Sequence, residues 1–146
     1  MKIYLDTCCL QRPLDSKEQL LVAIEGEAIL GVLHLCEAGS LDLLSSEALL
    51  FEIRRIPDES KKDYALEMLA KAKELIQVND TIEKLAEEFI TLGIKPLDAL
   101  HLASAEAFPA DYFCTCDLKF LNKAKKITKL KTTIVSPLEL IEGLEK

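Results

Sequence analysis

Apolar and polar positions follow two periods that alternate along the chain. Short apolar runs predict five β-strands, at residues 2–5, 41–44, 76–78, 111–115 and 132–135. Apolar residues at helical spacing, or segments after a capping residue, predict helices at 17–38, 45–55, 58–75, 79–92 and 97–107, after Asp117 and after Ser136. Residues 11–13 predict a loop. Strands that alternate with helices favour a three-layer α/β/α sandwich around a mostly parallel, five-stranded sheet.

The ends of several predicted helices carry recognisable stop and start residues. Gly39 and Gly93 follow helical segments, where glycine commonly ends a helix. Pro96 suits the first turn of the helix at 97–107. Residues 136–139 read Ser-Pro-Leu-Glu, which predicts a capping box with proline at the first helical position.

Length and composition indicate one globular domain over residues 1–146, since domains cluster near ~100–150 residues. Apolar residues make up 49% of the chain and charged residues 29%, which excludes intrinsic disorder. The longest apolar stretch, near residues 28–33, is far short of the ~18 residues that span a bilayer, so no membrane partner is expected. Asp6 interrupts any signal-peptide apolar region, which predicts a cytoplasmic protein.

The chain has five cysteines, at positions 8, 9, 36, 114 and 116. Without an export signal, reduced thiols are expected. The pairs Cys8-Cys9 and Cys114-x-Cys116 lack the usual zinc-site spacing. In extended strands Cys114 and Cys116 would share a face, whereas Cys8 and Cys9 would not. The cysteines are therefore expected to serve mainly as small buried packing residues.

Acidic residues stand where the predicted parallel strands end. In such sheets a site lies beyond the carboxyl ends of the strands. Asp6 ends the first strand, and Thr115 and Asp117 end the fourth and point the same way. Asp98 begins the helix before the fourth strand, and Glu52 lies on the helix after the second. Four converging carboxylates would repel one another unless a hard divalent cation such as Mg²⁺ or Mn²⁺ lay between them.

Each of these residues also has a plainer interpretation. Asp117 fits a helix cap, Asp98 fits a favourable charge at a helix N-terminus, and Asp6 fits a polar entry to a loop. Glu52 fits a solvated helix face, and Glu47 on the same helix competes with it as the second acid. His101 is expected to be a packed or hydrogen-bonding residue rather than a metal ligand.

Three segments together resemble the signature blocks of PIN domains, the nucleases that include VapC-type toxins. They are YLDTCCL at 4–10 with Arg-Pro at 12–13, DALHLA at 98–103, and DYFCTCD at 111–117. The resemblance covers nearly the whole chain, with the blocks in the right order. Cys8 departs from the family pattern, because many relatives carry a small hydroxyl or other polar residue there.

The resemblance implies metal-dependent cleavage of single-stranded or structured RNA. Its matching positions would make Asp6, Glu52, Asp98 and Asp117 the ligands of one or two Mg²⁺ or Mn²⁺ ions. Thr115 would orient a carboxylate, a water or a phosphate oxygen. The family also suggests an antitoxin protein and a homodimer as partners. The apolar faces at 17–38 and 58–75 would serve that dimer or the core.

The net charge of −7 runs against RNA binding, but it is unevenly spread. Residues 119–131 contain six lysines and no acid, and Arg54 and Arg55 follow Glu52. This pattern fits either a solvated basic surface or a basic rim around an acidic centre. Within the lysine segment only Phe120 offers an aromatic ring for base stacking.

Two other functions remain open. A metal-dependent phosphatase could use the same acids, although a D-x-D-x-T motif is absent. A catalytically silent PIN-like module could bind RNA or protein, although all four acids are present. No P-loop or G-x-G-x-x-G motif occurs, which excludes most nucleotide-binding functions.

Overall fold

A five-stranded parallel sheet forms the centre of the computed structural model, which describes residues 1–145. The strand order is β3-β2-β1-β4-β5, and every neighbouring pair is parallel. The strands are β1 (Lys2–Leu5), β2 (Asp42–Ser46), β3 (Glu74–Ile76), β4 (Tyr112–Cys114) and β5 (Thr133–Val135). β1 is the middle strand, with β2 and β3 on one side of it and β4 and β5 on the other.

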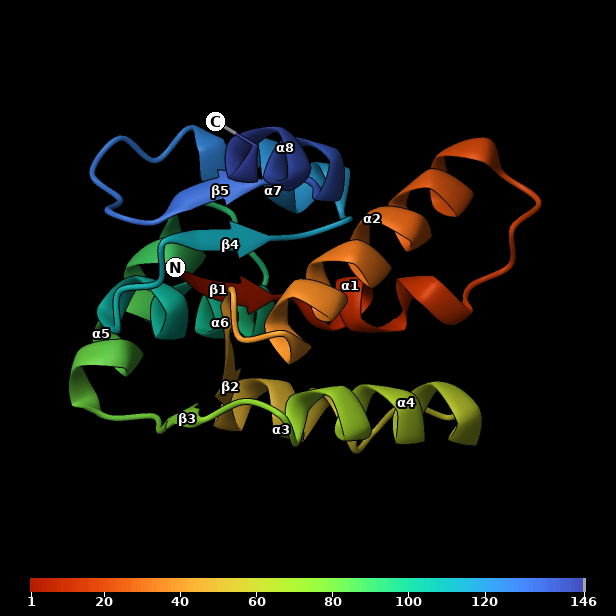
Figure 1. The fold of residues 1–146 in the computed structure, drawn as a ribbon. Helices are drawn as coiled ribbons and strands as arrows, with labels where there is room; N and C mark the ends of the chain where they lie inside the picture. Colours follow the sequence, from red (N-terminus) through yellow and green to blue (C-terminus); the bar gives the residue numbers. More distant parts are fainter. Residues whose placement is uncertain (146) are drawn as a thin grey trace.

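Helices cover both faces of this sheet (Figure 1). Within residues 1–145 they are α1 (Thr7–Gln11), the 3-10 helix η1 (Arg12–Leu14), α2 (Leu20–Glu37), α3 (Glu47–Ile53), α4 (Glu59–Leu69), α5 (Asp80–Thr91), α6 (Pro96–Ala107), α7 (Leu118–Lys125) and α8 (Pro137–Leu144). α2 packs against α8, and α5 packs against α6. The predicted three-layer α/β/α sandwich with a five-stranded sheet is confirmed, and the sheet is parallel throughout.

The helix starts follow the sequence signals closely. Side chains that accept a hydrogen bond from a backbone N–H in the first turn cap six of the described helices: Asp6, Ser46, Asp58, Asn79, Asp117 and Ser136. The capping box that begins at Ser136 is present with both of its hydrogen bonds. Gly93, just beyond α5, has φ +94°, a conformation that favours glycine.

Two predicted boundaries are wrong. Residues 11–13 are not a loop, because Asp6 caps α1 at residue 7 and the chain continues into η1. The helix predicted at 58–75 ends at Leu69, and β3 occupies 74–76 rather than 76–78. Pairing with β2 explains this shift, since Leu44 lies opposite Glu74 and Ser46 opposite Ile76. Strand pairing outweighs the local helical preference.

The core runs directly to the carboxyl edge of the sheet. Tyr4 of β1 stacks on Phe113 of β4 with ring centres 5.2 Å apart, and Phe113 meets Phe120 of α7 edge-on at 5.5 Å. All three rings are buried. Among the described helices, none combines the length and the apolar character needed to cross a bilayer.

Candidate metal centre

The topological switch of the sheet lies between β1 and β4, where β2 and β3 continue to one side and β5 to the other. In open parallel sheets, ligands bind beyond the carboxyl ends of the strands at such a switch. Asp6 directly follows β1, and its backbone N–H donates to the carbonyl of Cys114 at the end of β4 (2.9 Å). Thr115 follows β4, so Asp6 and Thr115 flank the switch from its two strands.

The carboxylate of Asp6 accepts two short hydrogen bonds, and a longer one from the Cys8 thiol to Oδ2 (3.5 Å). Oδ1 accepts the backbone N–H of Thr7 (2.8 Å), and Oδ2 accepts the hydroxyl of Thr115 (2.8 Å). The residue is only 4% exposed. Burial, reinforced by the neighbouring Cys8 thiol, raises the pKa of Asp6 to about 8, against the lowering effect of His101 and Thr115. Asp6 is thus a buried acid whose charge the surrounding protein does not balance.

Glu52 lies beside Asp6, and His101 joins the two. His101 Nε2 donates to Glu52 Oε1 (2.9 Å) and lies 3.8 Å from Asp6 Oδ1. Potential ligand atoms of the three residues are all within 4.8 Å of one another. Burial opposes ionisation of Glu52, but the His101 hydrogen bond prevails and lowers its pKa. Burial likewise opposes charge on His101, yet Glu52 and Asp6 raise its pKa overall.

The other ring nitrogen of His101 is bound to the core. Nδ1 shares a hydrogen bond with the Tyr4 hydroxyl (2.7 Å), and that hydroxyl also contacts Ser46 Oγ (2.7 Å). His101 is fully buried, as expected for a packed and hydrogen-bonding residue. This chain of hydrogen bonds fixes Glu52 against β1 and α6. Sequence reasoning did not foresee it.

Glu47, the competing second acid, points elsewhere. Its Oε1 accepts the backbone N–H of Val78 (2.6 Å), between β3 and α5. Of the two glutamates on α3, the structure therefore brings Glu52 to Asp6.

Asp98 and Asp117 approach the same edge of the sheet. Asp98 is half-buried in the first turn of α6. Burial raises its pKa to about 6, and the charges of Asp6, Asp117 and Glu52 add to this effect. Asp98 and Asp117 line one small hollow of about 50 Å³. Both lie outside the tighter group formed by Asp6, Glu52 and His101.

Asp117 does cap its helix, as the plainer interpretation held. Its Oδ1 accepts the backbone N–H groups of Lys119 (3.0 Å) and Phe120 (3.2 Å), and Oδ2 takes no part in that cap. The backbone N–H of Asp117 donates to Thr115 Oγ1 (3.2 Å). Since the same hydroxyl donates to Asp6, Thr115 links the segments that carry the two acids.

This donor set fits a hard divalent cation. The pKa values of Asp6 and Asp98 are raised by burial and by neighbouring carboxylates, a cost that positive charge beside them would relieve. Oxygen ligands suit Mg²⁺ or Mn²⁺. The buried hydroxyl of Thr7 finds no hydrogen-bond partner among residues 1–145, and Thr7 and Glu52 line one hollow together. A pocket lined by oxygen atoms, in which negative charge is not fully balanced by the protein, suits such a cation.

Four of the five cysteines lie near the end of β4. Cys8 and Cys9 are both on α1, and the sulfur atoms of both contact the segment that carries Cys114 and Cys116. Cys9 Sγ lies 3.7 Å from Cys114 Sγ and 3.6 Å from Cys116 Sγ. The backbone N–H of Cys116 donates to Cys8 Sγ (3.3 Å). Cys9 and Cys114 are buried in the core and Cys8, Cys36 and Cys116 pack against it, so the expected packing role is confirmed. In addition, the sulfur atoms of Cys8, Cys9 and Cys116 all lie within 4.8 Å of one another.

Basic side chains surround the acidic edge only in part. Lys95, Lys119 and Lys123 line the hollow that holds Asp98 and Asp117. Farther along the lysine-rich segment, Lys125 pairs with Glu139 (2.6 Å). The basic rim is thus formed by the lysines nearest the acids, not by the segment as a whole.

The aromatic residue available at this edge is not the one predicted. Phe120 is 4% exposed in the core, so it cannot stack on a base. Phe51, next to Glu52, is 53% exposed, and the Arg55 guanidinium lies 5.0 Å from its ring centre. Phe51 and Arg55 line the same hollow as Glu52.

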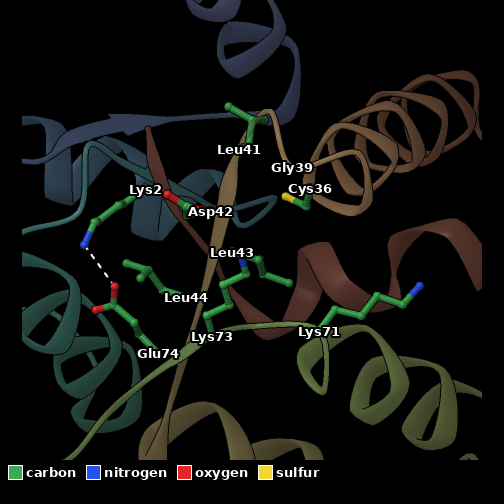
Figure 2. Close-up of a pocket in the computed structure, with 10 residues that line it drawn as sticks. All are labelled: Lys2, Cys36, Gly39, Leu41, Asp42, Leu43, Leu44, Lys71, Lys73 and Glu74. Atoms are coloured by element: carbon green, nitrogen blue, oxygen red, sulfur yellow. Dashed lines mark hydrogen bonds and ion pairs between the residues drawn. The ribbon is translucent and has the colours of Figure 1, made fainter.

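A separate hollow of about 300 Å³ lies at the opposite edge, where β1, β2 and β3 begin (Figure 2). Three of its charged side chains are engaged in ion pairs, Lys2 with Glu74 (3.1 Å) and Lys71 with Glu37 of α2. It is remote from the carboxyl edge and lacks the converging acids found there. It is also smaller than the hollow of about 550 Å³ that Thr7 and Glu52 line at the carboxyl edge.

Comparisons with known proteins agree with this architecture. The family model of the PIN domain matches residues 3–126. No curated protein matches the sequence. A chain of VapBC2 from Rickettsia felis, in a crystal structure bound to a DNA fragment from their promoter, has a TM-score of 0.60 at 17% identity, covering 93% of this chain and 98% of that chain. PAE2754 from Pyrobaculum aerophilum has a TM-score of 0.57 at 14% identity, covering 99% of this chain and 90% of that chain.

Proposed function

The chain belongs to the PIN-domain family, and from that premise we propose that it is an endoribonuclease that cleaves RNA phosphodiester bonds with Mg²⁺ or Mn²⁺. The observation that carries this proposal is the buried carboxylate of Asp6 at the switch point of the sheet, which lies within 4.8 Å of possible ligand atoms of Glu52 and His101 and whose pKa is raised by burial. Such perturbed acids gather at functional sites.

Four carboxylates would hold the cation: Asp6, Glu52, Asp98 and Asp117. When bound, it would lower the pKa of a water and stabilise charge on the phosphate oxygens during in-line attack. The remaining side chains act by orienting these acids. Thr115 fixes Asp6 through its hydroxyl, and His101 fixes Glu52 through Nε2. Outer partners of this kind commonly tune metal affinity and activity.

RNA as the substrate is supported by the surroundings of the acids. Lys95 and Lys119 beside Asp98 can neutralise phosphates, which supplies most of the affinity for nucleic acids. The exposed ring of Phe51, with Arg55 beside it, offers a stacking surface for an unpaired base. Both features border the acidic edge, so a strand bound by them would pass the carboxylates.

A toxin role with an antitoxin partner is the finer part of the proposal. It is supported by the resemblance to PIN domains of the VapC type and by the likeness to a chain of VapBC2. A homodimer is supported by exposed apolar residues on α2, such as Leu20 (76% exposed) and Leu21 (48%). Measuring the molecular mass of the purified protein in solution tests the homodimer. A monomeric mass at every protein concentration would exclude it.

Cleavage of single-stranded RNA tests the central proposal. The wild-type chain is expected to cut RNA with Mg²⁺ or Mn²⁺, to stop when EDTA is added, and to leave phosphomonoesters intact. Hydrolysis of a phosphomonoester without RNA cleavage would favour the phosphatase instead. RNA or protein binding without either reaction would favour a silent module.

His101→Phe is expected to reduce RNA cleavage by ~10- to 100-fold, because Glu52 loses the donor that orients it. It should also weaken Mn²⁺ binding and lower the free energy of unfolding by about 1–3 kcal/mol, since the buried Tyr4 hydroxyl loses a partner. Mn²⁺ titration separates the two effects. Unchanged Mn²⁺ affinity in a merely less stable protein would reduce His101 to a structural residue.

A further inference from the structure

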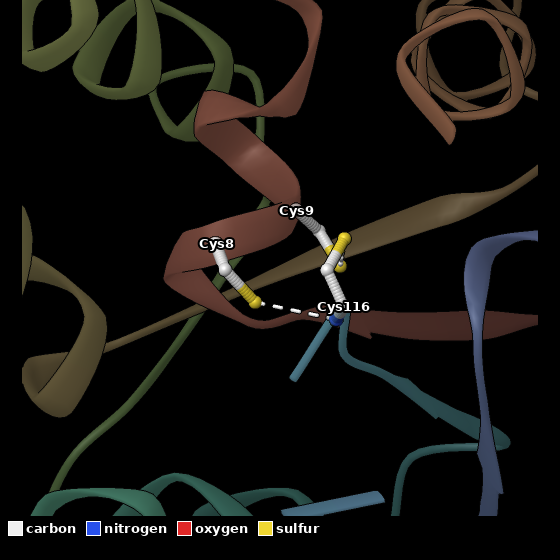
Figure 3. A group of neighbouring side chains, drawn as sticks. All are labelled: Cys8, Cys9 and Cys116. Atoms are coloured by element: carbon white, nitrogen blue, oxygen red, sulfur yellow. Dashed lines mark hydrogen bonds between the residues drawn. The ribbon is translucent and has the colours of Figure 1, made fainter. Parts of the chain in front are cut away.

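We propose that Cys8, Cys9 and Cys116 form a binding site for a thiophilic divalent cation of the Zn²⁺ class, separate from the carboxylates. Figure 3 shows the three side chains gathered at one point, two from α1 and one from the segment after β4. Their sulfur atoms all lie within 4.8 Å of one another. All three cysteines are free thiols.

The spacing of the sulfur atoms suits tetrahedral coordination. A Zn–S bond of ~2.3 Å in a tetrahedron places neighbouring sulfurs about 3.8 Å apart. Cys9 Sγ and Cys116 Sγ are 3.6 Å apart, so a cation could be bound with little movement of these two. Three protein thiolates leave a fourth position for water.

The backbone already provides a partner for one of the sulfurs. The N–H of Cys116 donates to Cys8 Sγ (3.3 Å), drawn as the dashed line in Figure 3. Hydrogen bonds from N–H groups to metal-bound sulfur are a regular feature of thiolate sites, where they orient the ligand and offset its charge. This hydrogen bond also fixes the loop after β4 against α1.

Arg12 supplies the charge balance. Three thiolates around a divalent cation leave one net negative charge, and the guanidinium of Arg12 lies beside Cys116. Arg12 is itself anchored by Asp15 (3.0 Å) and approaches Glu25 (3.4 Å). The guanidinium favours the thiolate form of Cys116. Burial raises the pKa of Cys9, and the hydrogen bond with Cys116 raises that of Cys8, so metal binding would release protons from these two thiols.

The thiol group adjoins the carboxylates but differs from them in chemistry. Cys8 Sγ lies 3.5 Å from Asp6 Oδ2 and 3.5 Å from Thr115 Oγ1. Soft thiolates select Zn²⁺-class ions, whereas carboxylates select Mg²⁺ or Mn²⁺. An ion bound by the thiolates would cross-link α1 to the loop after β4, the two segments that carry Asp6 and Asp117.

A cobalt titration of the reduced, metal-stripped full chain in excess Mg²⁺ tests this site. One equivalent of Co²⁺ is expected to produce thiolate-to-cobalt charge-transfer absorption, which Zn²⁺ abolishes by displacement and Mg²⁺ does not. Cys116→Ser should weaken Co²⁺ affinity by more than the ~10- to 100-fold that loss of an outer partner costs. Cys8→Ser provides the same test should Cys116→Ser not give a native circular dichroism spectrum.

Cys36→Ser is the matched control, because Cys36 lines the hollow at the opposite edge of the sheet (Figure 2). It should leave the absorption unchanged. The proposal is overturned if the wild type shows no charge-transfer absorption or if folded Cys116→Ser and Cys8→Ser retain it. Absorption lost equally in Cys36→Ser also overturns it. Because RNA cleavage is not measured, failure here is distinct from failure of the nuclease proposal.

Discussion

Asp98→Asn is expected to lower metal-supported RNA cleavage by at least ~100-fold while leaving the fold intact. The substitution keeps the shape of the side chain and removes one ligand charge. Asp98 is half-buried, and its pKa of about 6 reflects burial together with the charges of Asp6, Asp117 and Glu52. A carboxylate in that field is placed to share a cation with its neighbours. Initial rates over a range of Mn²⁺ concentrations measure the effect.

Asp80→Asn is the matched control for this variant. Asp80 occupies the first turn of α5 as Asp98 occupies the first turn of α6, but it is exposed. Both substitutions remove a favourable charge near a helix N-terminus, which is worth ~0.3–1 kcal/mol of stability. Only Asp98→Asn should affect cleavage. If both variants cleaved RNA at the same rate, Asp98 would serve only as a favourable charge at the N-terminus of α6.

The sequence was sufficient to identify the positions that strand ends and helix caps determine. Asp6, Thr115 and Asp117 could be placed together because parallel strands end at one edge and side chains alternate along a strand. Asp117 and Ser136 could be recognised as caps because their local sequence decides that role. Such features depend on a few consecutive residues.

Contacts between distant segments could not be read in this way. The hydrogen bond from Tyr4 to His101 depends on how α6 packs against β1, across 97 positions of sequence. The choice of Glu52 over Glu47 depends on the rotation of α3 on the sheet. The thiol group depends on α1, whose five residues are too few for a periodic signal.

The pKa of Asp6 has a definite consequence for stability in the absence of metal. A folded value of about 8 exceeds the ordinary value near ~3.9, so the native state holds a proton that the unfolded state has released. The stability from that proton is complete below pH ~4 and is lost as pH rises toward 8. Asp98, with a pKa of about 6, acts in the same direction.

Cys116 acts in the opposite direction over part of this range. Hydrogen bonds from Cys8 and Cys9, aided by Arg12, lower its pKa to about 5 against the effect of burial. Its thiolate therefore adds stability as pH rises from about 5 toward the ordinary thiol range. In the wild type, the change of unfolding free energy with pH is therefore a balance between the acids Asp6 and Asp98 and the thiol of Cys116. When two proteins that both contain Cys116 are compared, the contribution of Cys116 cancels to first order.

Asp6→Asn is therefore expected to gain stability relative to the metal-free wild type as pH rises from 5.5 to 8.5. The gain should reach at least ~1 kcal/mol, with an upper slope of about 1.4 kcal/mol per pH unit for one proton. Asparagine keeps an oxygen that can cap α1 by accepting the Thr7 N–H, and it has no charge to bury. Urea unfolding at several pH values, with EDTA present, measures the difference.

The same substitution should remove the response to Mg²⁺ or Mn²⁺, which is expected to stabilise only the wild type at pH 8. Stability gained together with loss of metal binding would mark Asp6 as a residue kept for function at a cost to the fold. A variant that is less stable by the same amount at every pH would show the contrary. Asp6 would then serve as the hydrogen-bond acceptor for Thr7 and Thr115, and its burial would be structural.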